Sequence, residues 1–255
     1  MLRLDKLDVG YGAPRGAVLS GLDVNVPPGS FVCVLGRNGA GKSTLMRTLS
    51  GLQGALGGRA LLDEEDIASM RPQTRARRIA VVLTERTSSP GLTGADVVSL
   101  GRQPFTGWQG HPTADDREKI DLALDLAAAS RFAARLFDDL SDGERQRIMI
   151  ARAIAQSPTL MVLDEITAFL DLPGRVETMA LLRSHVRATS GIALLSSHDL
   201  DLSLQLADSV WLLDGADGMA VGTPAELIAN GDVSHAFDTD AVRFCPTLGR
   251  FELVP

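Results

Sequence analysis

Apolar and polar residues alternate at the beginning of the chain. The apolar positions of this stretch are Leu2, Leu4, Leu22, Val24 and Val26. Alternation of this kind is typical of strands with one buried face, so we expect antiparallel strands here. The sequence PPGS breaks the pattern, and the run FVCVLG that follows is apolar throughout, as in a strand that is buried on both faces.

A helical pattern replaces the strands from about residue 88 to residue 157. Ile120, Leu124 and Phe132 fall at multiples of four residues and are expected on one helix face. Thr113, with Asp116 three residues later, predicts a helix start. This part of the chain is therefore expected to be a helical insertion between strands.

Strand patterns return in the second half of the chain. LMVLDE and IALLSSHD predict buried strands, and VWLLDGADGMAVG predicts two strands around a glycine turn. The tail that starts at Thr223 predicts two short helices and a final hairpin. We therefore expect an α/β fold with a single domain over 1–255, an inserted helical subdomain over 88–157, and C-terminal helices and a hairpin over 223–255.

Composition and charge narrow the class of protein. A net charge of −7 and an aromatic share of 4% disfavour a nucleic-acid surface or a base-stacking platform. Cys33 and Cys245 form neither a metal pattern nor a disulfide framework, which fits a reducing compartment, and Cys33 is expected to be a small buried hydrophobe. The N-terminus lacks a signal-peptide apolar stretch, and no apolar run approaches the roughly 20 residues of a membrane span.

The sequence GRNGAGKST (36–44) follows the buried strand and precedes a helical pattern. This is the context that the nucleotide-binding motif G-x-x-x-x-G-K-S requires, and it disfavours a simple glycine-rich turn. Backbone N–H groups of such a loop surround phosphates, while Lys42 adds charge at the β and γ phosphates and the Ser43 hydroxyl binds Mg²⁺. The residues expected to bind the nucleotide are Gly36, Arg37, Asn38, Gly39, Ala40, Gly41, Lys42, Ser43 and Thr44.

LMVLDE (160–165) ends in two carboxylates at the end of a buried strand, where ligands bind in open α/β sheets. We expect Asp164 to hold Mg²⁺ through water and Glu165 to polarise an attacking water. The pair could merely cap a neighbouring helix, but a phosphate loop in the same chain favours the nucleotide site. His198 follows another predicted strand and could hydrogen-bond to the γ-phosphate, although a lone histidine is more often structural or solvated.

LSDGERQR (140–147) contains a second helix start. Ser141 is expected to cap the helix, and Glu144 can reach back to the backbone of the cap. A helix start with free N–H groups also binds anions. A capping box alone would explain this sequence, and the pattern by itself does not say why a chain of one-domain size has a second anion-binding helix start.

Together these segments resemble the ATP-binding subunits of ABC transporters. GRNGAGKST resembles the phosphate loop of the family, LSDGERQR resembles its signature LSGGQ-x-QR, and SSHD resembles its switch-histidine segment. LMVLDEITAFLD resembles the magnesium strand with the loop that ends in Asp171, and Tyr11 in VGYG matches the aromatic residue that stacks on adenine. The resemblance implies a P-loop NTPase core with an antiparallel β subdomain and an inserted α-helical subdomain, which binds ATP and Mg²⁺.

The resemblance also implies a role for the second helix start. In this family two nucleotide domains pair head to tail, and the signature helix of one domain points at the ATP held by the other. Ser141 and the backbone of Gly143 would then contact the γ-phosphate across the interface, and Asp171 is expected among the nucleotide-contacting residues. Each pocket would be completed by two copies of the chain.

The signature departs from the family pattern at two positions. Asp142 replaces a glycine and Glu144 replaces a glutamine, which adds negative charge beside a phosphate. This charge is unfavourable unless the two carboxylates point away or pair with Arg145 or Arg147, although it does suit the dipole of the helix.

A third departure concerns the glutamine that the family places near residue 84. Thr84 stands at this position and is expected to bind water or Mg²⁺ weakly, unless Glu85 takes the role. The segment from Glu85 to Trp108 lies where family members meet the membrane subunit. Phe105 and Trp108 are candidate contacts, and the alternative for both is the core of the helical lobe.

The resemblance implies ATP hydrolysis that drives transport from the cytoplasmic face of the cell membrane, where the chain would be peripheral. The expected partners are a second copy of the chain, transmembrane permease subunits and, indirectly, a substrate-binding protein, with no nucleic acid. The alternative is a soluble ABC ATPase that acts on ribosomes or DNA, which the single nucleotide domain and the acidic charge disfavour. A non-catalytic binding module is disfavoured by Lys42, Asp164, Glu165 and His198.

The cargo class is suggested by LTGADVVSLGRQPFTGWQG, which resembles a segment of iron–siderophore, haem and cobalamin importers. The signature helix and the tail GTPAEL resemble the same branch. Sugar importers usually append a regulatory β domain for which 255 residues leave no room, and many exporters fuse this domain to their membrane spans. We therefore expect a bacterial importer subunit for ferric siderophores, with haem or cobalamin as the nearest alternative.

Overall fold

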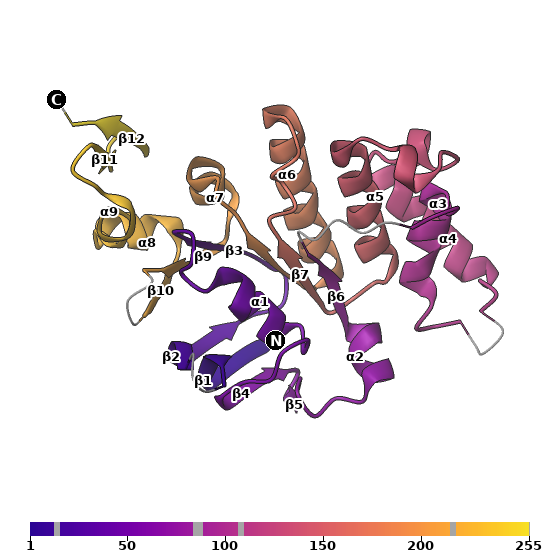
Figure 1. Cartoon of the computed structure of the whole chain (residues 1–255), viewed down its shortest axis with the longest axis horizontal. Coiled ribbons are helices and arrows are strands. Elements are labelled where there is room, and N and C mark those ends of the chain that lie inside the picture. The colour runs from indigo at the N-terminus through magenta and orange to yellow at the C-terminus, as the bar shows by residue number, and fades with distance from the viewer. Residues whose placement is uncertain (13–15, 84–88, 107–109, 215–217, 255) are drawn as a thin grey trace.

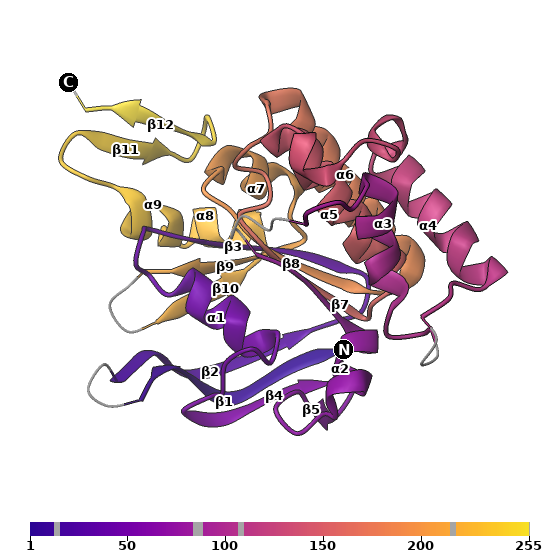
Figure 2. The ribbon, with the colours of Figure 1, turned by 45° about the vertical axis from the view of Figure 1, so that its right-hand side comes forward.

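The computed structural model describes residues 1–12, 16–83, 89–106, 110–214 and 218–254. Two sheets lie on either side of helix α1 (Lys42–Leu49), as Figures 1 and 2 show. The smaller sheet is antiparallel with the order β2-β1-β4-β5, which confirms the antiparallel strands predicted at the start of the chain. Its strands are β1 (Leu2–Tyr11), β2 (Gly16–Val26), β4 (Gly57–Leu62) and β5 (Glu65–Asp66).

The larger sheet has the strand order β10-β9-β3-β8-β7-β6. β3 runs parallel to β8 and β9, and β7 runs parallel to β6 and β8, whereas β10 runs antiparallel to β9. The carboxyl ends of β3, β8 and β7 therefore meet at one edge of the sheet. Its strands are β3 (Ser30–Gly36), β6 (Ile79–Val82), β7 (Leu160–Asp164), β8 (Ile192–Ser196), β9 (Ser209–Leu213) and β10 (Met219–Gly222).

Alternate residues of β3 supply two separate cores, which explains why its sequence is apolar throughout. Phe31 and Cys33 pack against the helices on the far face of the sheet, whereas Val32 and Val34 pack with α1 and the smaller sheet. Cys33 is fully buried, and burial raises the pKa of its thiol to about 12. The expectation that Cys33 is a small buried hydrophobe is confirmed.

Helices cover the far face of the larger sheet. The segment between β6 and β7 is rich in helices and contains α3 (Gly94–Ser99), η1 (Leu100–Arg102), α4 (Ala114–Leu126), η2 (Ser130–Phe132), η3 (Phe137–Asp139) and α5 (Asp142–Ala155). Outside this segment lie α2 (Pro72–Arg78), α6 (Leu172–Thr189) and α7 (Leu200–Leu206). Figure 1 places α3, α4 and α5 together on one side of α6.

Two details of this segment bear on the sequence predictions. The helix start predicted at Thr113 is confirmed, because Thr113 and Asp116 form a capping box at the beginning of α4. The prediction that Phe132 continues one helix face with Ile120 and Leu124 is wrong. All three side chains are buried, but α4 ends at Leu126 and Phe132 belongs to the separate turn η2.

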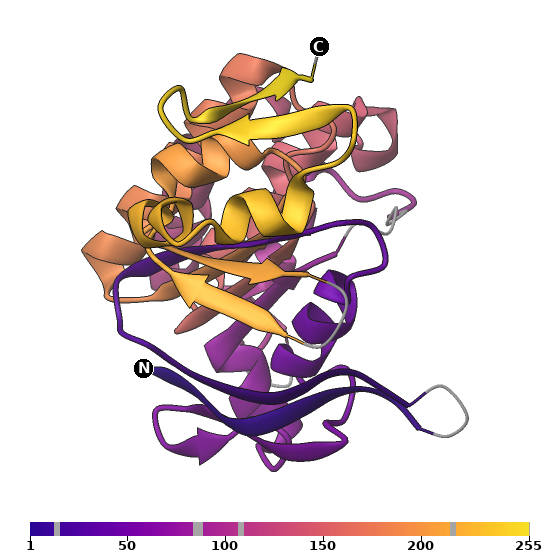
Figure 3. The ribbon, with the colours of Figure 1, turned by 90° about the vertical axis from the view of Figure 1, so that its left-hand side faces the viewer.

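The C-terminal segment contains α8 (Pro224–Ala229), α9 (Asp232–Phe237) and a hairpin of β11 (Val242–Cys245) and β12 (Arg250–Leu253). Phe251 of the hairpin contacts Phe244 and Phe237, with ring centroids 5.4 Å and 6.2 Å apart. Figure 3 shows the hairpin at the opposite end of the molecule from β1 and β2. Across the parts of the chain that the structure describes, we find no helix long and apolar enough to cross a membrane.

Candidate functional site

The phosphate loop connects the end of β3 to the start of α1, because the strand stops at Gly36 and the helix begins at Lys42. An added Cβ at Gly36 would lie only 2.6 Å from the carbonyl oxygen of Leu213 in β9. Gly39 has a φ of +84°, which favours glycine, and an added Cβ there would meet nothing within 4 Å. Glycine thus allows the loop to pass close to β9 and then to turn with an open outer side.

Lys42 is the first residue of α1, at the end of this loop, and is only 5% exposed. Its Nζ donates to the carbonyl oxygens of Gly36 at 2.8 Å and Arg37 at 3.3 Å. Burial lowers the pKa of the Lys42 ammonium, and the carboxylates of Glu165 and Asp164 act in the opposite direction. The loop therefore holds a buried cation beside its own backbone, where an anion can replace the carbonyl groups.

A hollow above the loop collects residues from three parts of the chain. It is lined by Tyr11, Val18, Asn38, Gly39, Gly41, Lys42, Ser43, Thr44 and Glu165. The Tyr11 hydroxyl lies 3.2 Å from the Thr44 hydroxyl, and the Tyr11 residue is 40% exposed. An exposed aromatic ring beside the N–H groups at a helix start can accommodate a flat base and its phosphates.

Two loop residues expected at the nucleotide have side chains that contact other parts of the protein. Ala40 is buried in the core between the two sheets. Arg37 Nη2 donates to the carbonyl oxygens of Phe237 at 3.3 Å and Asp238 at 3.0 Å, at the end of α9. The Arg37 side chain therefore ties the phosphate loop to the C-terminal segment, and its contribution to an anion site comes from its backbone.

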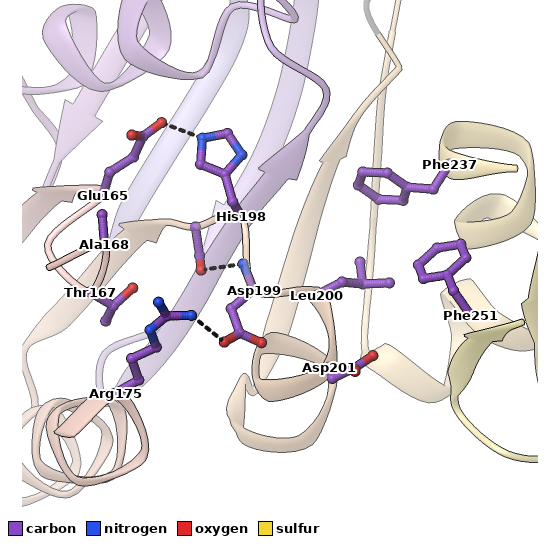
Figure 4. A pocket seen from close by; sticks show the side chains of 11 residues that line it. Glu165, Thr167, Ala168, Arg175, His198, Asp199, Leu200, Asp201, Phe237 and Phe251 are labelled. Atoms are coloured by element: carbon purple, nitrogen blue, oxygen red, sulfur yellow. Dashed lines mark hydrogen bonds and ion pairs between the residues drawn. The ribbon is translucent and has the colours of Figure 1, made fainter. Parts of the chain in front are cut away.

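Asp164 is the last residue of β7, and Glu165 follows it at the same edge of the sheet as the phosphate loop. Asp164 is buried, whereas Glu165 lines the hollow. His198, two residues beyond the end of β8, has its Nε2 2.6 Å from Glu165 Oε1 (Figure 4). The structure thus brings Glu165 and His198 together at the phosphate loop.

The residues expected at Mg²⁺ are Ser43, Asp164 and Thr84, of which Thr84 lies outside the described residues. Ser43 lines the hollow at the start of α1, and Asp164 lies at the end of β7. Among the side chains that the structure describes, no group of three or more His, Cys, Asp or Glu could hold a metal. Mg²⁺ bound with a nucleotide keeps several waters and needs only one or two protein carboxylates, so this donor set fits the ion.

Helix α5 begins with the capping box predicted at Ser141. The Ser141 N–H donates to Glu144 Oε2 at 2.8 Å, and the Glu144 N–H donates to Ser141 Oγ at 3.4 Å. Glu144 Oε1 also pairs with Arg135 at 2.8 Å. These contacts, led by the Ser141 N–H, hold the pKa of Glu144 below its usual range.

Of the two arrangements left open for these carboxylates, pairing of Glu144 with Arg145 or Arg147 does not occur, because Glu144 pairs with Arg135. Arg145 is the next residue on the helix and does not face Glu144, and it donates to backbone carbonyl groups of η3 instead. Arg147 pairs with Glu177 of α6 at 3.2 Å. The cation that neutralises Glu144 comes from the loop before the helix, so the signature sequence by itself could not reveal it.

Ser141, Gly143 and Asp171 are not among the residues that line the hollow at the phosphate loop. Asp171 caps α6, where its Oδ1 accepts the Gly174 N–H at 3.1 Å. An added Cβ at Gly143 would lie 3.4 Å from the carbonyl oxygen of Phe169, so the start of α5 packs against the loop that follows Glu165. Within one copy, the signature residues form a surface separate from the phosphate loop.

A second hollow lies beside Glu165 and His198 (Figure 4). Arg175 connects two of its walls, because its Nε donates to the Leu170 carbonyl oxygen at 2.9 Å and its Nη1 lies 3.4 Å from Asp199 Oδ2. Arg175 is not among the residues predicted at the site, because no local pattern indicates a contact with Asp199, 24 residues further along the chain. The remaining lining residues are Thr167, Ala168, Ser197, Leu200, Asp201, Phe237 and Phe251.

Thr84, Glu85 and Trp108 lie outside the described residues, so the roles expected for them stay predictions. Phe105 is half-buried, and the Arg102 guanidinium carbon lies 4.0 Å from the centroid of its ring. Phe105 therefore packs on a buried arginine of the helical layer. A contact of Phe105 with a membrane subunit also stays a prediction.

Comparison with known proteins shows the family of the chain. Residues 19–168 match the ABC transporter family model. The chain is 36% identical over 253 residues to an uncharacterized ABC transporter ATP-binding protein of Methanocaldococcus jannaschii. The aligned residues cover 99% of this chain and 87% of that protein. It is 34% identical over 232 residues to the ferric enterobactin transport ATP-binding protein FepC of Escherichia coli. This alignment covers 89% of this chain and 83% of that protein.

A solved structure extends the likeness to the fold. The cbiO1 protein of Clostridium perfringens, part of the ABC transporter complex cbiONQ, has a TM-score of 0.77 and 26% identity, over 91% of this chain and 92% of that one. The two sheets, the parallel strand order and the phosphate loop agree with this family and confirm the expected P-loop NTPase fold. The chain therefore belongs to the ABC transporter family, as a subunit that binds and hydrolyses ATP.

Proposed function

We propose that this chain powers the uptake of ferric siderophores, in two copies beneath separate membrane subunits at the cytoplasmic face of the cell membrane. The observation that carries the catalytic part is the 2.6 Å contact between His198 Nε2 and Glu165 Oε1, at the edge of the hollow that contains Lys42. A carboxylate held by an imidazole beside a phosphate loop suits the activation of a water molecule as well as the binding of a nucleotide.

In the proposed site, ATP lies in the hollow with its adenine on the exposed ring of Tyr11. The loop N–H groups surround the phosphates, and the Lys42 ammonium exchanges its contacts with loop carbonyls for the β and γ phosphates. Ser43 and Asp164 would hold Mg²⁺, which when bound neutralises charge on the same two phosphates.

Hydrolysis needs a base for the attacking water, and Glu165 would take this role. Its carboxylate lines the hollow and takes the proton of a water that attacks the γ-phosphate. The contact with His198 fixes the direction of the carboxylate, and the imidazole would also bind the γ-phosphate. Glu165→Gln keeps the shape of the side chain but removes the proton acceptor, so hydrolysis should slow by about 10²–10⁴ while ATP binding persists.

A second copy would complete each site with the start of its helix α5. The N–H groups at this helix start and the Ser141 hydroxyl suit a γ-phosphate. The charge of Glu144 does not oppose this role, because the carboxylate is held by the Ser141 N–H and by Arg135. The capping box thus fixes the helix start and directs the acidic side chain to a cation of its own chain.

The cargo is inferred from likeness. The ferric enterobactin relative and the resemblance of the segment LTGADVVSLGRQPFTGWQG to siderophore importers support a ferric siderophore. Haem and cobalamin are the nearest alternatives, because the same segment resembles importers of all three. The partners would be two permease subunits and, through them, a substrate-binding protein that delivers the cargo.

Uptake of radiolabelled ferric siderophore, haem and cobalamin tests this proposal in a strain that lacks the gene. The strain is compared without the gene, with the parent gene and with Lys42→Ala, which removes the cation of the phosphate loop. We expect the parent gene alone to restore ferric siderophore uptake. Normal uptake of all three cargoes in the deleted strain, with loss of an unrelated solute, would overturn the cargo and leave the ATPase intact.

A further inference from the structure

Ser196 is a fully buried polar residue at the carboxyl end of β8. β8 lies between β3, which leads into the phosphate loop, and β7, which ends in Asp164. Ser196 is the register partner of Asp164 across the β7–β8 pair and of Val34 across the β3–β8 pair. A hydroxyl at this point is surrounded by strands on both sides, so its hydrogen bonds must be made within the protein.

The Ser196 hydroxyl acts both as a hydrogen-bond donor and as an acceptor. It donates to Asp164 Oδ1 at 2.5 Å, and its oxygen accepts the Glu165 N–H at 3.0 Å. The Glu165 N–H also lies 3.2 Å from the Ser196 carbonyl oxygen. One side chain therefore contacts both residues of the proposed magnesium and water-activating pair.

The backbone of Glu165 explains why the second contact matters. Its φ of +52° lies in the left-handed region, which is unfavourable for a residue other than glycine and persists where the surroundings hold it. This conformation turns the Glu165 side chain from the strand direction toward His198, with which it makes the 2.6 Å contact. The Glu165 N–H is held by the hydroxyl and carbonyl oxygens of Ser196, which stabilises this backbone conformation.

We propose that Ser196 is a positioning residue that sets the orientation of Asp164 toward Mg²⁺ and of Glu165 toward the attacking water. The inference rests on the proposed roles of these two carboxylates. The hydroxyl bonds to one carboxylate oxygen of Asp164 and so restricts rotation of the carboxylate that would help to hold Mg²⁺. Outer partners of metal-binding groups affect metal affinity or activity by about 10–100-fold, which is the scale expected here.

The test compares full-length Ser196→Ala and Ser196→Thr with the parent and with Ser30→Ala. Ser30 is a matched control, because its buried hydroxyl lies at the start of β3, at the opposite end of the same sheet, and donates to the Pro27 carbonyl oxygen at 2.7 Å. Three quantities are measured: ATP affinity in EDTA, Mn²⁺ affinity with a non-hydrolysable ATP analogue by electron paramagnetic resonance, and the kcat of ATP hydrolysis with Mg²⁺. If Ser196→Ala does not fold, Ser196→Cys replaces it, because a thiol keeps the volume but is a weak donor.

We expect Ser196→Ala to lower Mn²⁺ affinity and kcat by about 10–100-fold while ATP affinity in EDTA stays at the parent level. Ser196→Thr, which keeps the hydroxyl, should restore both quantities. The proposal is overturned if Ser196→Ala matches Ser30→Ala in all three measurements, if ATP affinity in EDTA falls in parallel with Mn²⁺ affinity, or if threonine fails to restore function in a folded chain. Glu165→Gln tests the underlying assignment separately, since parent-level hydrolysis in that variant would refute the role of Glu165 whatever Ser196 does.

Discussion

Asp116→Asn removes the negative charge from a buried ion pair that joins three elements of the helical layer. Arg102 of η1 and Asp116 of α4 are each 3% exposed, and Arg102 Nε lies 2.8 Å from Asp116 Oδ1. Arg102 Nη1 also donates to the Ala155 carbonyl oxygen at the end of α5, at 2.9 Å. The other carboxylate oxygen of Asp116 accepts the N–H and the hydroxyl of Thr113, at 2.9 Å and 2.7 Å.

The magnitude follows from the burial of this pair. Removing one partner leaves the Arg102 guanidinium buried without its counter-charge, which typically costs about 3–5 kcal/mol. Asparagine keeps one acceptor oxygen, so the lower part of this range is expected. For a chain of this size each kcal/mol lowers the unfolding midpoint by about 2–4 °C, so a cost of about 3–4 kcal/mol corresponds to a loss of about 6–16 °C.

Thermal unfolding followed by circular dichroism measures this loss. Asp115→Asn is the matched control, because Asp115 is the preceding residue of the same helix and its pair with Lys119 is exposed, with 66% and 38% of the side chains accessible. An exposed pair of this kind contributes about 0–1 kcal/mol. If Asp116→Asn lowers the midpoint no more than Asp115→Asn does, the reasoning from burial is refuted.

Three further changes test other parts of the account. Contacts from Thr113 and Arg102 lower the pKa of Asp116 from 3.8 to about 2. The ionised carboxylate therefore stabilises the fold fully well above pH 3.8, and this stabilisation is lost as the pH falls toward 2. The difference in unfolding midpoint between the parent and Asp116→Asn should shrink over that pH range. Lys42→Ala should abolish ATP binding in a direct binding assay, because hydrogen bonds to charged groups contribute about 1.5–3 kcal/mol each, and unchanged affinity would refute the phosphate-loop assignment. Arg37→Ala should speed hydrogen exchange of the α9 amides with little change in the unfolding midpoint, whereas unchanged exchange would refute the tie to the C-terminal segment.

Much of the fold could be predicted because the relevant signals are local. The alternation at Leu2 and Leu4, the apolar run before Gly36 and the capping residues Thr113 and Ser141 all act within a few positions of the chain. Phe132 was assigned to the wrong element because a spacing of eight residues fits a helix equally well whether or not the helix ends between them. Periodicity cannot detect such a break.

The less predictable parts of the site depend on contacts between distant segments. The sequence predicts Asp164 and Glu165 in one motif and His198 in another, but the meeting of the two motifs at the phosphate loop follows from the order of β3, β8 and β7. The partner of Glu144 is Arg135, which lies outside the signature sequence. These contacts depend on strand order and loop paths, which the local pattern of the sequence does not specify.

The requirement for two copies at each ATP is tested most directly by the mass of the Glu165→Gln chain in solution with ATP and Mg²⁺, measured by light scattering. One copy has a mass of 27.1 kDa. We expect the mass to double with ATP and to remain that of one copy with ADP. With ATP and the added substitution Ser141→Arg we also expect the mass of one copy, because the bulky side chain would block the helix start that meets the γ-phosphate. Two results would contradict the shared site. One is the mass of a single copy with ATP, found also when the membrane subunits are present. The other is a doubled mass in the chain that carries Ser141→Arg.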